Sequence, residues 1–173
     1  MNEIIKAILD RRSCRSYKEE QIGEEELSQI LQAGTYAASG MNMQSAKLVV
    51  VQDEETREQL RKMNAAIMGS PDADPFYGAP TIVVVLADTD SRNWFADGCL
   101  VMGNLMLAAS ALGVGSCWIN RALEGFDSPE GKALLKKWGI DARYRGVGHC
   151  ILGYAAAPLP AAKPRKKDYI VRI

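Results

Sequence analysis

Residues 98–120 read GCLVMGNLMLAASALGVGSCWIN and contain no charged side chain. The run is long enough to be tested as a membrane-spanning segment. However, Gly113 and Gly115 interrupt it, and Trp118 and Ile119 after them favour a strand. The pattern therefore predicts a central helix at 93–112, apolar nearly all round and so buried, followed by a buried strand at 114–119.

Further helices and strands are predicted on both sides of this segment. Two helices precede it, at about 2–10 with Asn2 as a possible cap, and at about 24–37 with three glutamates in the first turn. The remaining patterns predict strands at 47–52, 82–86 and 145–154, a helix at 54–68 and a short helix that opens at Ser128. Because helices separate consecutive strands, we expect an α+β fold in which helices flank a central mixed β-sheet with some parallel neighbours.

The composition is that of one globular domain covering residues 1–173, since no repeat or linker divides the chain before residue 155. Apolar residues make up 47% and the formal net charge is zero, which argues against nucleic acid or a membrane surface as partner. The four cysteines form no CxxC pair and no zinc pattern, so we expect reduced thiols in a cytoplasmic protein without a metal site. The N-terminus has charges within its short apolar stretch, which is not the pattern of a signal peptide.

Two basic clusters lie at opposite ends of the chain. The first is RRSCRSY at residues 11–17, where guanidinium and hydroxyl groups could bind a phosphate through charge-assisted hydrogen bonds. The second is KPRKK at residues 163–167, in a proline-rich tail that is predicted to be extended. Taken singly, each cluster is better explained as solvated cations. Together they could close around one phosphate if the tail folds back.

A third polar segment, SGMNMQ at residues 39–44, is predicted to be a loop. Its asparagine and glutamine amides can donate and accept hydrogen bonds at once, which suits the edge of a planar heterocycle. Taken alone, the segment is better explained as an ordinary surface loop.

These segments together resemble the FMN-dependent nitroreductase family. RRSCRSY is similar to the family's opening motif, and residues 39–44 are similar to its second motif, which is usually followed by Pro-Trp. The 98–120 run resembles the family's central helix and Gly-rich strand, and ILGY with the later KPR resembles its closing strand and tail. The ordered set covers essentially the whole chain. It implies a nitroreductase-like fold and an intertwined homodimer with FMN at the interface and the 155–173 tail packed on the partner subunit.

The resemblance also implies a role for each matching position. Phosphate contacts would come from Arg11, Ser13, Lys163 and Arg165, with Arg12 near the ribityl chain or phosphate. Arg15 would face the pyrimidine edge, where a positive charge stabilises the anion formed on reduction. The remaining contacts would be Ser39, Gly40 and Asn42 of the partner subunit beside the flavin, Asn64 near its polar edge, and the backbone of Ile119, Asn120 and Arg121 near N5.

Two features of the second motif depart from the family pattern. Ala38 stands where the family usually has proline, and Ser45 with Ala46 stands where it usually has Pro-Trp. A bulky wall near the flavin is therefore missing. We therefore expect the size of the pocket and the packing of the loop to differ from the family pattern.

Three other residues are assigned mainly structural roles. His149, the single histidine, lies in an apolar strand and is expected to be a satisfied core residue. Asp97 at the start of the central helix is expected to be a capping or buried structural carboxylate. Cys14 lies among three arginines, which should lower a thiol's pKa and leaves a redox role open.

The resemblance implies a ping-pong oxidoreductase. NADH or NADPH would deliver hydride to flavin N5 and leave, and a nitroaromatic, quinone or similar acceptor would then take the electrons. Two alternatives stay open at this point, because fold alone does not decide the reaction. One is another flavin reaction on the same scaffold, such as dehalogenation, enoate reduction or flavin breakdown, and the other is a non-enzymatic FMN-binding or sensing protein.

Overall fold

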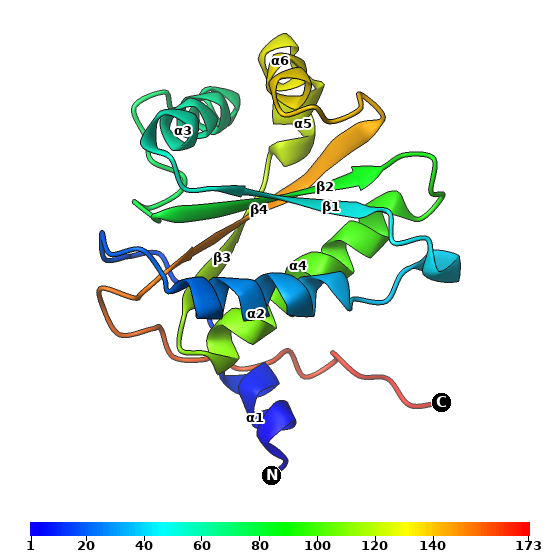
Figure 1. The fold of residues 1–173 in the computed structure, drawn as a ribbon. Helices are drawn as coiled ribbons and strands as arrows, with labels where there is room; N and C mark the ends of the chain where they lie inside the picture. The colour runs from blue at the N-terminus through cyan, green and yellow to red at the C-terminus, as the bar shows by residue number, and fades with distance from the viewer.

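The computed structural model describes residues 1–173 and has one four-stranded sheet between two layers of helices (Figure 1). The strands pair in the order β1-β2-β4-β3, and every pair is antiparallel. Their bounds are Ala46–Val51 for β1, Thr81–Asp88 for β2, Gly115–Ile119 for β3 and Tyr144–Gly153 for β4.

The expectation of parallel neighbours in the sheet is wrong for these four strands. The two strands joined by the central helix, β2 and β3, do run in the same direction, as a helical crossover requires. However, the last strand, β4, is inserted between them and is antiparallel to both. The one parallel pairing in the chain is an isolated bridge between Ser13 and Ser116.

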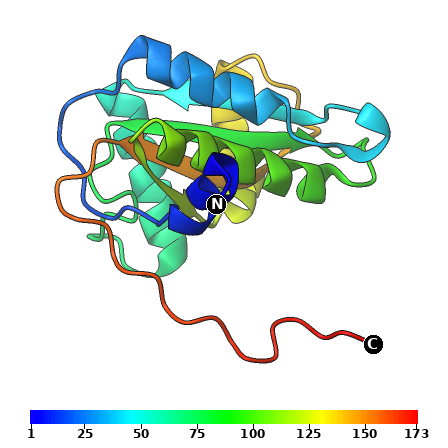
Figure 2. The same ribbon diagram turned by 90° about the horizontal axis from the view of Figure 1, so that it is seen from below.

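The six α-helices cover both faces of the sheet (Figures 1 and 2). Alternate residues of β2 point into two separate cores: Ile82 and Val84 pack with α3, α5 and α6, whereas Val83 and Val85 pack with α2 and α4. The helices are α1 Glu3–Asp10, α2 Glu24–Thr35, α3 Glu54–Met68, α4 Trp94–Ala111, α5 Ala122–Asp127 and α6 Pro129–Lys137, and a short 3₁₀ turn, η1, covers Gly40–Asn42.

Side-chain caps begin two helices where the sequence predicts. The Asn2 carboxamide oxygen accepts from the backbone N–H groups of Ile4 and Ile5 at the start of α1. Ser128 accepts from the N–H of Gly131 at the start of α6. The helix α5 was not predicted, because it has only six residues and follows a left-handed residue, Arg121, with φ of 74°.

The central helix α4 is buried on one face only, which corrects the expectation of burial all round. Only 33% of its residues are buried, and Phe95 and Leu100 are 46% and 51% exposed. By length and composition alone, α4 is the one helix that would suit a membrane crossing. The apolar stripe of α1 is exposed as well, with Ile4 at 67%. The two helices contact one another and are adjacent in Figure 2, so together they present a large apolar surface.

The segment after β4 is extended and returns past the C-terminal end of α1 (Figure 1). Proline at residues 158, 160 and 164 accounts for the lack of helix here. The last residues of this tail are apolar yet exposed: Tyr169, Ile170, Val171 and Ile173.

Candidate functional site

The basic segment at residues 11–17 lies along the ends of β3 and β4. The backbone N–H of Cys14 donates to the carbonyl oxygen of Ser116 at 2.9 Å, next to the parallel Ser13–Ser116 bridge. Beyond it, Tyr17 pairs with Ala155 in an antiparallel bridge. These contacts fix the segment as an extra, short strand-like edge, so the directions of its side chains are determined by the sheet.

Within this segment, alternate side chains point to opposite sides. Cys14 is 2% exposed, and its thiol donates to the carbonyl oxygen of Ser16. Ser13 and Arg15 on either side of it face a cavity. The close approach needs glycine at residue 115, because a Cβ there would lie 2.9 Å from both Cβ and Sγ of Cys14. Cys14 is therefore a packing residue here, enclosed between the segment and β3.

Both basic clusters line one cavity of about 810 Å³, at the C-terminal end of α1. This size lies within the range of about 300–1,000 Å³ usual for small-molecule sites. The lining includes no acidic residue and five cationic ones: Arg11, Arg12, Arg15, Lys163 and Arg165. The tail does fold back, so residues about 150 positions apart meet around a site that favours an anion.

Two of these cations, Arg11 and Arg12, differ in the hydrogen bonds that they form within the protein. Nη1 of Arg12 donates to the carbonyl oxygens of Leu9 and Arg11, at 2.7 and 2.9 Å, and so closes the end of α1. In contrast, Nη1 of Arg11 is buried and has no hydrogen-bond partner. A buried, unpaired guanidinium nitrogen is costly. A bound phosphate would supply the missing acceptor, and the residues present fit such a group.

A second polar group lies at the other end of β3. The side chain of Asn64, from α3, is buried; its Nδ2 donates to the carbonyl oxygen of Asn120 at 2.8 Å. Its Oδ1 accepts from Nε of Arg121 at 2.9 Å. Asn120 and Arg121 directly follow Ile119, so the predicted contacts from α3 and from the end of β3 do lie together. Arg121 is held in a left-handed conformation there, and such strained positions cluster at functional sites.

His149 lies behind this second group, in β4 opposite Ile119. It is 3% exposed and packs against the rings of Phe76 and Phe126, with centroids 5.2 and 6.1 Å away. Burial lowers the pKa of His149 to about 4, and the nearby Arg121 acts in the same direction. The core position is as predicted, but the side chain is not fully satisfied, because Nδ1 has no partner.

The third predicted segment, with Ser39, Gly40 and Asn42, does not line the cationic cavity of its own chain. It forms the turn η1, which Figure 1 shows in cyan at the far end of α2 from α1. A smaller cavity of about 150 Å³ lies beneath it, lined by Ser39 and Asp97 among others. Asp97 is 4% exposed, which agrees with the predicted buried carboxylate. Its pairing with Ser45 was not foreseen; the serine in place of the usual proline is the signal that could have indicated it.

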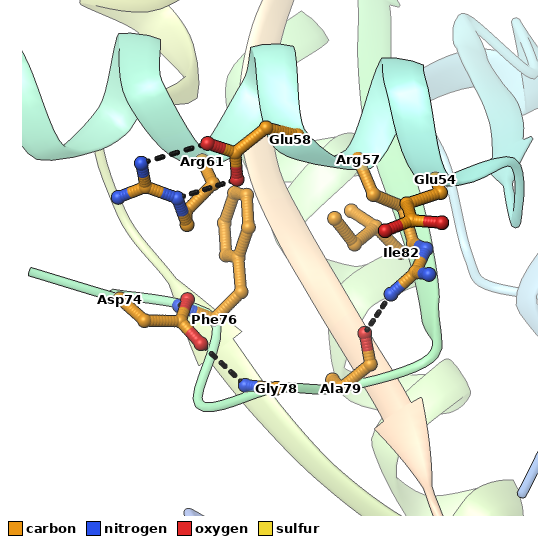
Figure 3. A pocket seen from close by; sticks show the side chains of 9 residues that line it. All are labelled: Glu54, Arg57, Glu58, Arg61, Asp74, Phe76, Gly78, Ala79 and Ile82. Atoms are coloured by element: carbon orange, nitrogen blue, oxygen red, sulfur yellow. Dashed lines mark hydrogen bonds and ion pairs between the residues drawn. The ribbon is translucent and has the colours of Figure 1, made fainter. Parts of the chain in front are cut away.

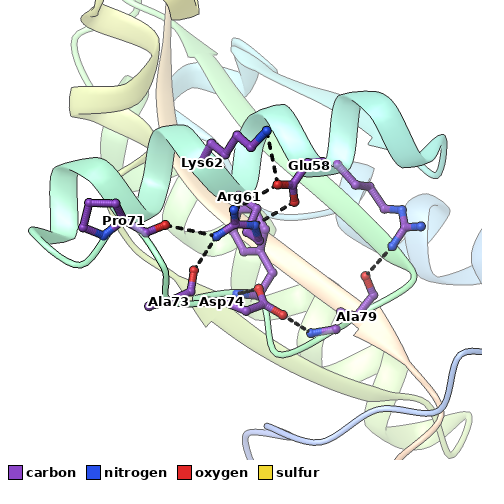
Figure 4. A network of polar contacts seen from close by, with 10 residues as sticks. Glu58, Arg61, Lys62, Pro71, Ala73, Asp74 and Ala79 are labelled. Atoms are coloured by element: carbon purple, nitrogen blue, oxygen red, sulfur yellow. Dashed lines mark hydrogen bonds and ion pairs between the residues drawn. The ribbon is translucent and has the colours of Figure 1, made fainter.

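Another cavity, of about 250 Å³, lies between α3 and residues 74–79 (Figure 3). The two arginines that line it already form hydrogen bonds within the protein. Arg57 donates to the carbonyl oxygens of Gln52 and Ala79. Arg61 pairs with Glu58 and donates to the carbonyl oxygens of Ala73 and Pro71 (Figure 4). These contacts tie the loop to α3 and keep Phe76 beneath His149, which is a structural role.

Known proteins are similar to this chain in sequence and in fold. The sequence profile of the Nitroreductase family matches residues 8–154. A protein of Archaeoglobus fulgidus, named for NADH dehydrogenase and NAD(P)H nitroreductase, is 36% identical over 69% of this chain and 68% of its own length. The FMN reductase [NAD(P)H] of Bacillus subtilis is 36% identical over 51% of this chain, which spans only 33% of that enzyme. The crystal structure of a nitroreductase with bound FMN from Bacteroides fragilis has a TM-score of 0.91 and 32% identity, with both chains fully covered.

The profile match covers both the first basic segment and the asparagine–arginine group at the end of β3. The match to the Bacteroides fragilis structure covers the full length of both chains. The chain therefore belongs to the Nitroreductase family.

Proposed function

We propose that the chain is an FMN-dependent oxidoreductase that takes reducing equivalents from NAD(P)H and passes them to a small acceptor such as a nitroaromatic or a quinone. The observation that carries the proposal is the cationic cavity. Five cations, no carboxylate and a buried guanidinium nitrogen without a partner suit a doubly charged phosphate. The FMN bound by the similar Bacteroides fragilis protein and the name of the Bacillus subtilis reductase support the choice of cofactor and reductant.

We infer a division of roles along β3. Arg11, Ser13, Lys163 and Arg165 would hold the phosphate, with Arg12 beside it as the cap of α1. At the other end of β3, Asn120 lies four residues beyond Ser116 along the chain, and Asn64 and Arg121 are grouped with it. That distance is about 13 Å at the usual rise per residue. A ligand with a phosphate at one end and a ring at the other would span it.

The bound FMN would supply hydride acceptance from the nicotinamide and electron delivery to the second substrate. The protein's part is binding, orientation and charge. Arg15 beside the pyrimidine edge would stabilise negative charge that builds up there on reduction. The Asn64 and Arg121 pair would fix the backbone of Ile119 and Asn120 against the reactive edge. No side chain is assigned as acid or base, and we expect ping-pong kinetics at one shared face.

We further propose that two copies form a homodimer with a site at each interface. The exposed apolar surface of α1 and α4 supports this, because surfaces of this kind usually mark an interface. In such a dimer, Ser39, Gly40 and Asn42 would reach the partner's cofactor, which explains why they lie away from the cavity of their own chain. The apolar end of the tail would pack on the partner subunit.

The first test is an absorbance spectrum of the purified protein, with FMN added if needed, before and after anaerobic NADH and then NADPH. We expect a flavin spectrum that bleaches with one or both nucleotides. A flavin spectrum that stays oxidised with both would overturn the choice of reductant, and failure to bind FMN would overturn the cofactor. Initial rates at varied acceptor concentrations should give parallel double-reciprocal lines, and light scattering should give twice the 18.9 kDa chain mass.

A further inference from the structure

A single buried carboxylate, that of Asp97, holds both ends of the loop at residues 40–45, which contains the turn η1. Oδ1 of Asp97, in the first turn of α4, accepts from the backbone N–H of Gly40 at 3.0 Å. Oδ2 accepts from the hydroxyl of Ser45 at 3.2 Å and from that of Ser91 at 3.5 Å. Gly40 and Ser45 stand five residues apart at the two ends of the loop, so one side chain closes it.

The loop between these two ends is strained. Met41, Asn42 and Gln44 have φ values of 51°, 55° and 48°, and they are three of the five non-glycine residues with positive φ in the chain. Oγ of Ser39, just before the loop, accepts from the N–H of Gln44 at 3.1 Å, and Oδ1 of Asn42 accepts from the Gln44 side-chain amide at 3.2 Å. Such backbone conformations persist only where the surroundings fix them.

The fit beneath the loop is close at Gly40. A Cβ at this position would lie 2.3 Å from Nδ2 of Asn93, the residue that precedes α4. The loop is thus pressed onto the start of α4, where the carboxylate of Asp97 faces it. Negative charge in the first turn of a helix is itself favourable, so the carboxylate is held in place by α4 as well as by its three donors.

We propose that Asp97 is a positioning residue, a latch that keeps Gly40 and its neighbours Ser39 and Asn42 in the shape that contacts the cofactor of the partner subunit. The contact with the partner's cofactor rests on the proposed function, whereas the hydrogen bonding of Asp97 to the loop does not. Ser45 is the residue that distinguishes this loop from the usual family motif. It stands where the family motif usually has proline, and its hydroxyl gives Asp97 a second hold on the loop.

Two measurements on the full-length protein test the proposal. Hydrogen–deuterium exchange of peptides covering residues 39–45, without added FMN, reports on the latch. The dissociation constant for FMN, from quenching of flavin fluorescence, reports on positioning. The variants are Asp97→Ala, Asp97→Asn and Ser45→Ala. The matched control is Ser91→Ala, which removes a donor to the same Oδ2 atom but leaves the loop's own contacts intact.

We expect Asp97→Ala and Ser45→Ala to speed exchange in the loop and to weaken FMN binding, each by roughly tenfold, as expected when a hydrogen bond to a charged group is lost. Asp97→Asn should restore most of both, because its amide can accept from Gly40 and donate to Ser45. Ser91→Ala should stay within about twofold of the wild type in both measurements, since the bond it removes is the longest of the three.

Unchanged exchange in Ser45→Ala would overturn the latch, even if Asp97→Ala failed to fold. Faster exchange with an unchanged FMN dissociation constant would overturn the positioning role. If the wild type bound no FMN at all, the proposed function would fail, and the exchange data would still decide whether Asp97 latches the loop.

Discussion

Arg11→Ala is expected to weaken FMN binding without destabilising the protein that lacks FMN. Nη1 of Arg11 is buried without a hydrogen-bond partner, and the Arg11 side chain lines the cationic cavity. A hydrogen bond to a charged group contributes about 1.5–3 kcal/mol, so losing the phosphate contact should raise the dissociation constant roughly tenfold to a hundredfold. A buried unpaired polar group costs about 1–3 kcal/mol, so its removal should leave the unliganded fold as stable as before, or more so.

Thermal unfolding with and without FMN measures both effects in one experiment. At a concentration 100 times the dissociation constant, a ligand stabilises the fold by about 2.7 kcal/mol. If binding is tenfold weaker at the same concentration, about 1.4 kcal/mol remains. For a chain of this size, the loss should shrink the FMN-dependent rise in Tm by about 3–5 °C.

Arg12→Ala is the matched control, because its guanidinium is adjacent but is bonded to the end of α1. We expect it to lower the stability of the unliganded protein by about 1 kcal/mol and to change FMN affinity less than Arg11→Ala does. The reasoning is refuted if Arg11→Ala keeps FMN affinity within twofold of the wild type. It is also refuted if the two variants lower the unliganded Tm equally.

Three further predictions concern charge, pH and packing. Arg15→Ala should lower the flavin's reduction potential and slow its reduction by NAD(P)H while FMN stays bound, since the charge that stabilises the reduced anion is lost; spectroelectrochemistry would detect no shift if this were wrong. The pKa of His149 is lowered to about 4 in the folded state, whereas the unfolded chain binds a proton below about pH 6.5. The free energy of unfolding should therefore fall by up to about 3 kcal/mol between pH 6.5 and 4, and urea midpoints of His149→Gln should show a flatter dependence. Gly115→Ala should destabilise the protein by about 1–3 kcal/mol, because its Cβ would collide with Cys14; an unchanged Tm would contradict the packing argument.

The sequence predicts most helices and strands, because their caps and periodicity are local. It does not predict the order of the strands, since the insertion of β4 between β2 and β3 depends on pairing between residues at least thirty positions apart. Nor does it show which face of α4 is covered. That helix is apolar all round, so its pattern has no polar stripe to identify the side that faces away from the sheet.

For the site, the sequence supplies the residue types but not their partners. Adjacent arginines are expected to behave alike, yet the end of α1 turns Arg12 back to the helix carbonyls and leaves Arg11 free. The folding back of the tail follows from no local pattern, and the cavity exists only because of it. The contacts of Ser39, Gly40 and Asn42 with a partner's cofactor remain a prediction, because they require a second chain.

The tail that completes the cationic cavity has few other attachments. Ala156 donates its N–H to the carbonyl oxygen of Ser16, and after it no residue forms a hydrogen bond with the body of the chain. A phosphate held by Lys163 and Arg165 would therefore fasten the end of the polypeptide as well as anchor the cofactor. Trypsin cleaves after lysine and arginine. The rate at which it cuts within residues 163–167 should therefore fall as the fraction of protein with bound FMN rises.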